Sequence, residues 1–247
     1  MLNHGEHPPG IEVFTLSEDA ETLTFQRTIT HPLMRTPNSV QPISDHEIYF
    51  SNDHTYEVRD HPILAKLENF GHIAKGNVGY LDLATDEGKI VAELPFANGV
   101  AQLNSTHLAV ASTTGLSVHV FEMQADHSLN QTLRIRCDAW VDNLRVDSAG
   151  KLLMTAHPYA LLLEGVAKNQ HKYNLDAGRL DGLDPSTRPK AGSWVAEWDG
   201  NTDGIIRRLY VDDGQEFGTS TTTARDVKRG VGFTVGLYEK GILQFGF

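Results

Sequence analysis

The sequence contains a single cysteine, Cys137, among its 247 residues. One thiol cannot form a disulfide within the chain or a structural zinc site, so we expect cross-links to contribute nothing to stability. Long apolar runs are also missing: no stretch approaches the roughly 20 apolar residues of a membrane-spanning helix, which predicts no membrane span. The first residues, 1–7, have neither a basic flank nor an apolar run, so we expect no signal peptide there, and the cellular location stays open.

Positive charge is scarce as well. The chain has 21 Lys and Arg against 32 Asp and Glu, a formal net charge of −11. This excess repels phosphate backbones, so we expect no nucleic-acid partner. The acidic residues are scattered along the chain, which is typical of a solvated surface. With 40% hydrophobic residues the chain can still bury a substantial core, and nothing in it indicates an oligomeric state.

Short segments with alternating apolar and polar residues dominate the chain. Turn residues separate them at intervals of roughly 8–12 residues, which is typical of an all-β sandwich, barrel or propeller. We therefore expect an all-β fold. The predicted strands include 11–16, 22–29, 47–51, 78–83, 89–94, 107–112, 116–123, 151–156, 194–198, 205–211 and 231–237.

One segment has a helical pattern. Asp60 and the proline two residues later supply a cap and an early helical proline. Four apolar residues then recur at helical spacing, which predicts that they share one face: Ile63, Leu64, Leu67 and Phe70. Residues 165–192, in contrast, are polar and rich in turn residues, so we expect a long surface insertion there.

Three asparagines mark a weak internal repeat. Asn38, Asn98 and Asn143 each open a new series of strands, at intervals of 60 and 45 residues. Four-stranded units of roughly 40–50 residues are typical of propeller blades, and the longer interval contains the predicted helix. Since the first strand of each blade lines the central channel, we expect the three side chains to converge on the propeller axis.

Such an arrangement would bind a metal ion. Three amide oxygens together with the carboxylate of Asp142 form a hard oxygen cage, which suits Ca²⁺ better than zinc or copper. Each asparagine alone would be an ordinary turn residue. Their recurrence at matching repeat positions favours the metal site.

Several strings in this order resemble the calcium-dependent arylesterase/paraoxonase family, which is related to the gluconolactonase-like propellers. The strings are Pro37-Asn38-Ser39-Val40, Tyr49-Phe50-Ser51-Asn52-Asp53-His54, Phe96-Ala97-Asn98-Gly99, Val141-Asp142-Asn143-Leu144-Arg145-Val146-Asp147 and Ala156-His157-Pro158. The resemblance covers nearly the whole chain. It implies a six-bladed β-propeller fold, with residues 1–247 as one domain.

The resemblance also implies a reaction. By position, Asn38, Asn98, Asp142 and Asn143 match ligands of the family's catalytic calcium. That ion would polarise the carbonyl of a small-molecule ester or lactone and stabilise the oxyanion formed when water attacks. The chain would then be a calcium-dependent arylesterase or lactonase.

Three histidines match positions around the same pocket. His4 aligns with one member of the family's histidine dyad, proposed as the general base for water, a role that suits an imidazole with a pKa near neutrality. His54 and His157 match histidines that line the pocket. The helix after Asp60 corresponds to a lid in the family; an amphipathic helix packed on the propeller rim is the alternative.

The match is incomplete at the N-terminus. The family's first blade carries an acidic pair of calcium ligands and the second dyad histidine, and neither has a counterpart here. We therefore expect an N-terminally truncated propeller of about four to five blades. Ser39 also replaces an acid that many relatives use for a second calcium, so only one calcium is expected. The alternative function is a non-catalytic β-propeller that binds a partner.

Overall fold

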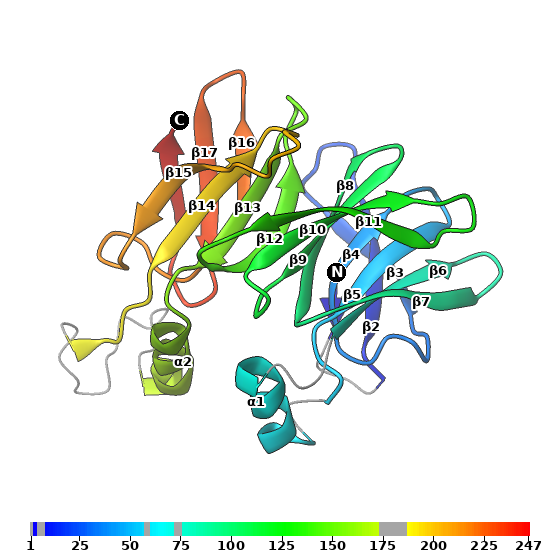
Figure 1. Ribbon diagram of the computed structural model, residues 1–247, viewed down its shortest axis with the longest axis horizontal. Helices are drawn as coiled ribbons and strands as arrows, with labels where there is room; N and C mark the ends of the chain where they lie inside the picture. The colour runs from blue at the N-terminus through cyan, green and yellow to red at the C-terminus, as the bar shows by residue number, and fades with distance from the viewer. Residues whose placement is uncertain (1, 4–7, 57–59, 72–75, 173–186) are drawn as a thin grey trace. The chain divides into compact units, whose positions relative to one another are not determined.

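The computed structural model describes residues 2–3, 8–56, 60–71, 76–172 and 187–247 (Figure 1). Within these ranges the chain forms 18 strands in five antiparallel sheets. The chain divides into two compact units. Unit one comprises Met1–Val100 with Met123–Leu129, and unit two comprises Ala101–Glu122 with Asn130–Phe247.

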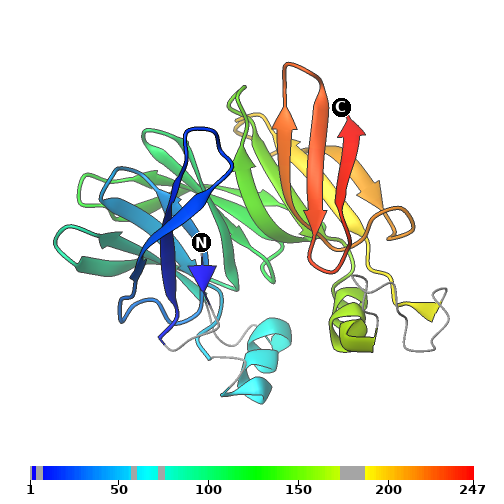
Figure 2. The same cartoon turned by 180° about the vertical axis from the view of Figure 1, so that it is seen from behind.

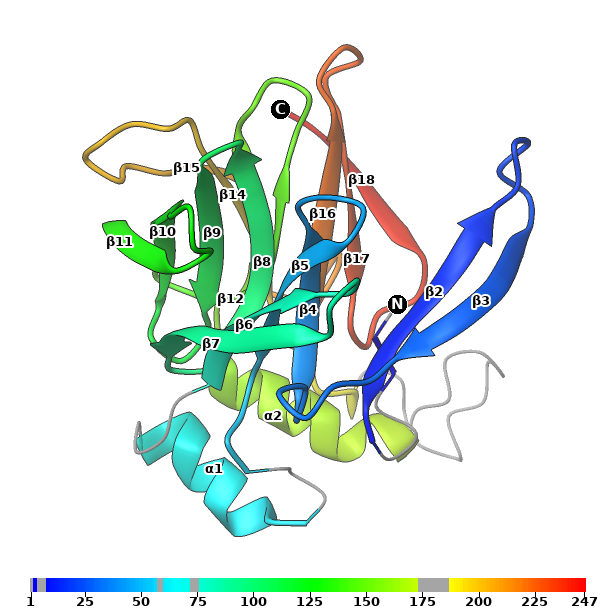
Figure 3. The same ribbon diagram turned by 90° about the vertical axis from the view of Figure 1, so that its right-hand side faces the viewer.

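Unit one contains two complete sheets. The first has the order β1-β2-β3, and its β2–β3 hairpin is the blue hairpin of Figure 2. The second has the order β4-β5-β6-β7, and helix α1 lies beyond one end of its strands (Figure 3). The bounds are β1 Leu2–Asn3, β2 Gly10–Leu16, β3 Leu23–Ile29, β4 Pro37–Pro42, β5 Glu47–Asn52, α1 Pro62–Gly71, β6 Gly76–Asp82 and β7 Glu87–Leu94.

Unit two contains the sheets β12-β13-β14-β15 and β16-β17-β18 (Figure 1). The remaining sheet has the order β11-β10-β9-β8, and the boundary between the units falls within β8. The bounds are β8 Ala97–Asn104, β9 His107–Ser112, β10 Ser117–Met123, β11 Leu129–Arg136, β12 Trp140–Val146, β13 Leu152–His157, α2 Ala160–Asn169, the 3-10 helix η1 Gln170–Lys172, β14 Ser193–Trp198, β15 Arg207–Asp212, β16 Ser220–Asp226, β17 Val231–Gly236 and β18 Ile242–Gly246.

Each unit has its own core, built from the inward faces of these strands. In unit one, Phe50 on β5 packs directly over Gly79 on β6, where a Cβ atom would lie 2.2 Å from the ring. Only glycine leaves room for the ring at this position. The core of unit two gathers small and branched side chains around Val141, Leu152 and Met154, with Trp194 and Trp198 from β14. Burial of these faces supplies the main driving force for folding.

The strand predictions are confirmed. Every predicted strand coincides with an observed one to within two residues at each end. The three predicted repeats correspond to the sheets that begin with β4, β8 and β12. A three-stranded sheet precedes them and another follows, as expected for an incomplete propeller. The all-β fold class is therefore confirmed, while the single domain over 1–247 stays a prediction.

Two helical features differ from expectation. Helix α2 begins before the predicted insertion at 165–192 and runs into its start, because its first residues, Ala160 to Leu163, are good helix formers even though Leu161 and Leu162 are exposed. Helix α1 forms where predicted, but the apolar side chains described on it are exposed. Its apolar residues Ile63, Leu64 and Leu67 are exposed, while Ala65 and Glu68 are buried. An amphipathic helix ordinarily packs its apolar face against the core, so the exposure of these three is not what the pattern favours. The side chain of Phe70 lies outside the described part.

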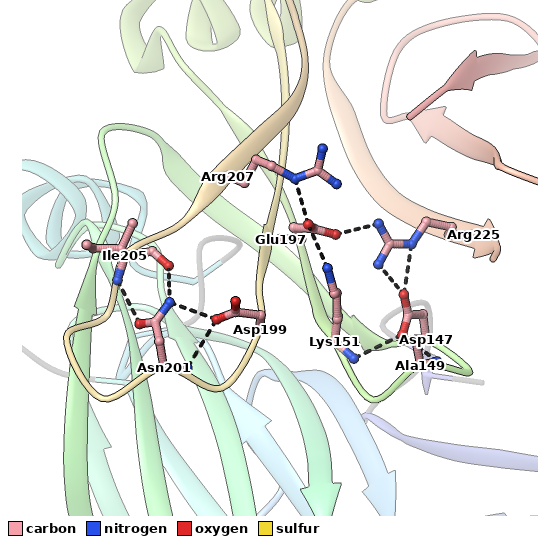
Figure 4. Close-up of polar contacts among 9 residues, drawn as sticks. All are labelled: Asp147, Ala149, Lys151, Glu197, Asp199, Asn201, Ile205, Arg207 and Arg225. Carbon is pink, nitrogen blue, oxygen red and sulfur yellow. Dashed lines mark hydrogen bonds and ion pairs between the residues drawn. The ribbon is translucent and has the colours of Figure 1, made fainter.

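A buried charge network ties the sheet of β16–β18 to the sheet of β12–β15 (Figure 4). The Arg225 guanidinium on β16 donates to the carboxylates of Asp147 and Glu197, and all three side chains are at most 4% exposed. Lys151 Nζ and Arg207 Nε also donate to Glu197 Oε1, at 3.1 and 2.7 Å. The ring of Phe247 lies 4.4 Å from the guanidinium carbon of Arg225. Arg225 thus pairs with two carboxylates and Glu197 with three cations, while Asp147 pairs with Arg225 and accepts from the backbone amides of Ala149 and Lys151.

Replacing Arg225 by alanine should destabilise unit two strongly, because two buried carboxylates would lose their shared counterion. Breaking a buried pair from one side typically costs about 3–5 kcal/mol. The control is Arg229→Ala, whose side chain is 79% exposed and pairs with Asp226 in the same sheet; it should cost less than about 1 kcal/mol. Denaturant unfolding measures both. Equal losses in the two variants would contradict the assigned role of the network.

The network should also make unit two sensitive to acid. Burial raises the pKa of the Glu197 carboxyl, but hydrogen bonds from Arg207, Arg225 and Lys151 outweigh it and lower the pKa to about 2. A lowered folded-state pKa stabilises the fold above the unfolded pKa, and that contribution is lost as pH falls towards the folded pKa. The free energy of unfolding should therefore decline between the ordinary value of 4.5 and about 2. Glu197→Gln should flatten this decline in a pH series of denaturant melts; an unchanged decline would contradict it.

Candidate functional site

Several of the predicted site residues lie in β-bulges. A register shift in the pairing of β4 with β5 places Asn38 in a bulge. A shift in the pairing of β12 with β13 does the same for Asp142 and Asn143. Bulges re-aim side chains and are frequent next to active sites. A third shift, between β16 and β17, places Thr221 at a corresponding point, which sequence analysis missed because threonine is ordinary in a strand.

In unit one, Asn38 and His54 share one carboxylate. Asn38 Nδ2 donates to Asp53 Oδ2 at 3.1 Å, and Asp53 Oδ1 lies 2.8 Å from His54 Nδ1. The His54 side chain is buried, and the ring of Phe96 meets it edge-on with centroids 4.7 Å apart. Phe96 itself has a φ of +48°, a strained conformation for a bulky residue that costs on the order of 1–3 kcal/mol. The sequence motif that contains Asp53 does not by itself indicate this role.

Two serine hydroxyls tie the strands of Asn38 and Asn98 together. Ser51 Oγ donates to the Asn98 carbonyl at 2.7 Å and accepts from Ser39 N at 3.0 Å. Ser39 Oγ in turn accepts from Val100 N at 3.1 Å. Ser39, the residue that replaces an acid of the family, therefore serves here as a backbone tie between β4 and β8. Asn98 is buried at the start of β8.

In unit two, Asn143 and His157 also share one carboxylate. Asn143 Nδ2 donates to Asp142 Oδ1 at 3.2 Å, and His157 Nε2 lies 3.2 Å from Asp142 Oδ2. The segment is held from the other side by Thr113, whose hydroxyl donates to the Val141 carbonyl at 2.6 Å. His157 is buried, and its Nδ1 has no hydrogen-bond partner among the described residues. A ligand would satisfy this nitrogen, whose burial otherwise costs about 1–3 kcal/mol.

Each unit thus presents the same chain of an amide, a carboxylate and an imidazole. Because Asn38 and Asn143 use their amide nitrogens as donors, their amide oxygens are the atoms left to accept a hydrogen bond or to bind a metal ion. Oxygen donors of this kind, with one or two carboxylates, fit Ca²⁺.

The described residues include no group of three or more His, Cys, Asp or Glu side chains that could hold a metal. A metal site built from them would therefore depend on the amide oxygens. Asn38 and Asn98 belong to unit one, whereas Asp142 and Asn143 belong to unit two. The convergence of the four residues on one ion stays a prediction. His4, the predicted general base, lies outside the described residues.

The fold is that of a β-propeller. Similar solved structures include a putative gluconolactonase, with 16% identity and a TM-score of 0.51 over 85% of this chain and 58% of that one. A protein from Lactobacillus plantarum has 12% identity and a TM-score of 0.56 over 99% of this chain and 64% of that one. At these identities the similarity concerns the fold alone.

The sequence comparisons define the family. The arylesterase family model matches residues 1–172, and the chain belongs to this family. Serum paraoxonase/arylesterase 2 of Canis lupus familiaris is 31% identical over 161 residues, which are 64% of this chain and 44% of that protein. Serum paraoxonase/lactonase 3 of Oryctolagus cuniculus is 31% identical over 166 residues, 66% of this chain and 46% of that protein. The chain therefore matches less than half the length of these relatives. No helix within the described ranges has the length and apolar character to cross a membrane.

The shared carboxylate in unit one fixes the tautomer of His54. A carboxylate only accepts hydrogen bonds, so the proton of neutral His54 should reside on Nδ1. Imidazole ¹⁵N shifts should show this tautomer in the wild type and a mixture in Asp53→Ala. The matched control, Asp45→Ala, removes an exposed carboxylate and should leave the His54 signals in place. Protonation on Nε2 in the wild type would contradict the assigned hydrogen bond.

Proposed function

We propose that this chain is a calcium-dependent hydrolase of small-molecule esters or lactones. Membership of the arylesterase family supports the reaction class, since relatives carry the names arylesterase and lactonase. The observation that carries the proposal to this chain is the pair of amide–carboxylate–imidazole chains, Asn38–Asp53–His54 and Asn143–Asp142–His157. Both are built on bulged strand starts, where the repeat predicts the site.

The metal ligands would be Asn38, Asn98, Asp142 and Asn143. When bound, calcium would polarise the carbonyl oxygen and stabilise the oxyanion. The bulges turn Asn38, Asp142 and Asn143 out of the regular pleat, and the Asn38 and Asn143 amide nitrogens are each anchored on a carboxylate. Anchoring in advance lowers the cost of organising the cage around an ion.

The histidines would handle the proton of the attacking water. With its Nδ1–H donating a hydrogen bond to Asp53, neutral His54 would have Nε2 as its basic nitrogen. His157 contacts Asp142 through Nε2, which leaves its buried Nδ1 as the nitrogen that can accept a proton or a substrate hydrogen bond. His4 would be a further general base, by resemblance to the family dyad. For His54 and His157 the neighbouring carboxylate would orient the ring for the transfer.

Calcium at millimolar concentration should raise the melting temperature, because an ion that binds only the folded state stabilises it. At a concentration 100-fold above Kd the gain is about 2.7 kcal/mol. Asn98→Ala should abolish the shift, while Asn130→Ala, a change of an exposed asparagine, should preserve it. Thermal melts with calcium and with chelator measure this. A wild-type melt that does not respond to calcium would refute the metal site.

Hydrolysis should depend on the same ion. A panel of aryl acetates and aliphatic lactones, assayed with and without chelator, should show turnover that chelation removes and calcium restores. His54→Gln and His157→Gln should each reduce kcat by about 10²–10⁴-fold if the imidazole moves a proton in the rate-limiting step. Turnover that survives chelation would contradict the mechanism. A calcium-dependent melt without any turnover would instead support the alternative, a non-catalytic binding propeller.

A further inference from the structure

Helix α1 is attached to unit one through a carboxylate. Ile63 is 75% exposed, and Leu64 and Leu67 are 41% and 46% exposed. Among the side chains that the structure describes in this helix, Ala65 and Glu68 are buried, three residues apart on one face. Because alanine offers little apolar area, hydrophobic packing by these residues contributes little to holding the helix.

Both carboxylate oxygens of Glu68 accept hydrogen bonds from consecutive backbone amides. Thr55 N donates to Oε1 at 2.8 Å, and Tyr56 N donates to Oε2 at 3.0 Å. Hydrogen bonds to a charged acceptor are shorter and stronger than neutral ones. The pair also compensates the burial of the carboxylate, which would otherwise be unfavourable. Glu68 therefore joins α1 to the segment that follows β5.

The segment held by Glu68 begins immediately after His54. On the other side, Thr36 holds the backbone of His54 itself: Thr36 Oγ1 donates to the His54 carbonyl at 2.8 Å and accepts from His54 N at 3.1 Å. The ring is oriented separately by Asp53. The backbone around His54 is thus fixed by one hydroxyl before it and one carboxylate after it.

We propose that Glu68 is a positioning residue, which fixes the backbone behind His54 and couples the position of helix α1 to that of the imidazole. The consequence for catalysis rests on the proposed function, but the coupling itself does not. Loss of the Glu68 carboxylate frees the Thr55 and Tyr56 amides, releases α1 and widens the range of positions open to the His54 ring. His157 belongs to unit two, where its imidazole contacts Asp142.

The test compares Glu68→Ala and Glu68→Gln with Glu18→Gln, which removes an exposed carboxylate elsewhere in unit one. Amide hydrogen exchange at Thr55 and Tyr56 should accelerate at least about tenfold in Glu68→Ala, because both acceptors are gone. Glu68→Gln keeps one acceptor and should accelerate exchange less. The control should leave both rates unchanged. Wild-type exchange rates at both amides in Glu68→Ala would overturn the proposal.

Imidazole NMR signals separate positioning from general destabilisation. In Glu68→Ala the His54 signals should shift or broaden while the His157 signals keep their wild-type positions. Equal changes at both histidines, or faster exchange with an unchanged His54, would show a purely structural role and overturn the proposal. If the wild type hydrolyses esters, kcat should fall in Glu68→Ala with KM changed less. If the wild type is inactive, the proposed function fails, yet the exchange and NMR results still decide the role of Glu68.

Discussion

The candidate site depends on aspartates that serve two partners at once. Asp53 and Asp142 each accept from an asparagine amide and contact a buried histidine. An acceptor-only carboxylate between an amide and an imidazole fixes the orientation of both, because the two neighbours must present donors to it. The amide oxygens of Asn38 and Asn143 and the buried Nδ1 of His157 are left for a ligand. The same local solution recurs in both units, at strand starts where bulges interrupt the pleat.

The buried charges around Arg225 pair in a different way. In unit two, Arg225, Asp147 and Glu197 are almost fully buried and pair between two sheets, and Lys151 and Arg207 add further positive charge beside Glu197. Such a cluster contributes less to stability than its count of contacts implies, since desolvation offsets most of the attraction. It does penalise any arrangement in which the sheets separate or slip. Ion pairs thus hold two sheets of unit two together, whereas carboxylate–imidazole contacts orient His54 and His157.

Much of this architecture could be predicted from the sequence. Alternation of apolar residues located the strands, because the pleat has a strict period of two, and the recurrence of Asn38, Asn98 and Asn143 located the repeats. The direction of α1 could not be predicted, because the pattern of Ile63, Leu64 and Leu67 favours an inward apolar face. Glu68 is buried instead, and it accepts hydrogen bonds from backbone amides that a sequence does not display. The bulges and the role of Asp53 escaped for the same reason, since both depend on register.

The central proposal is that Asn38, Asn98, Asp142 and Asn143 bind one calcium ion. Isothermal titration calorimetry of the chain with calcium tests it most directly, with Asn38→Ala as the variant in unit one and Asn143→Ala as the variant in unit two. The account predicts one ion per chain, and a loss of binding in either variant. Binding that survives in one variant and disappears in the other, or a stoichiometry of two, would show separate sites and contradict it.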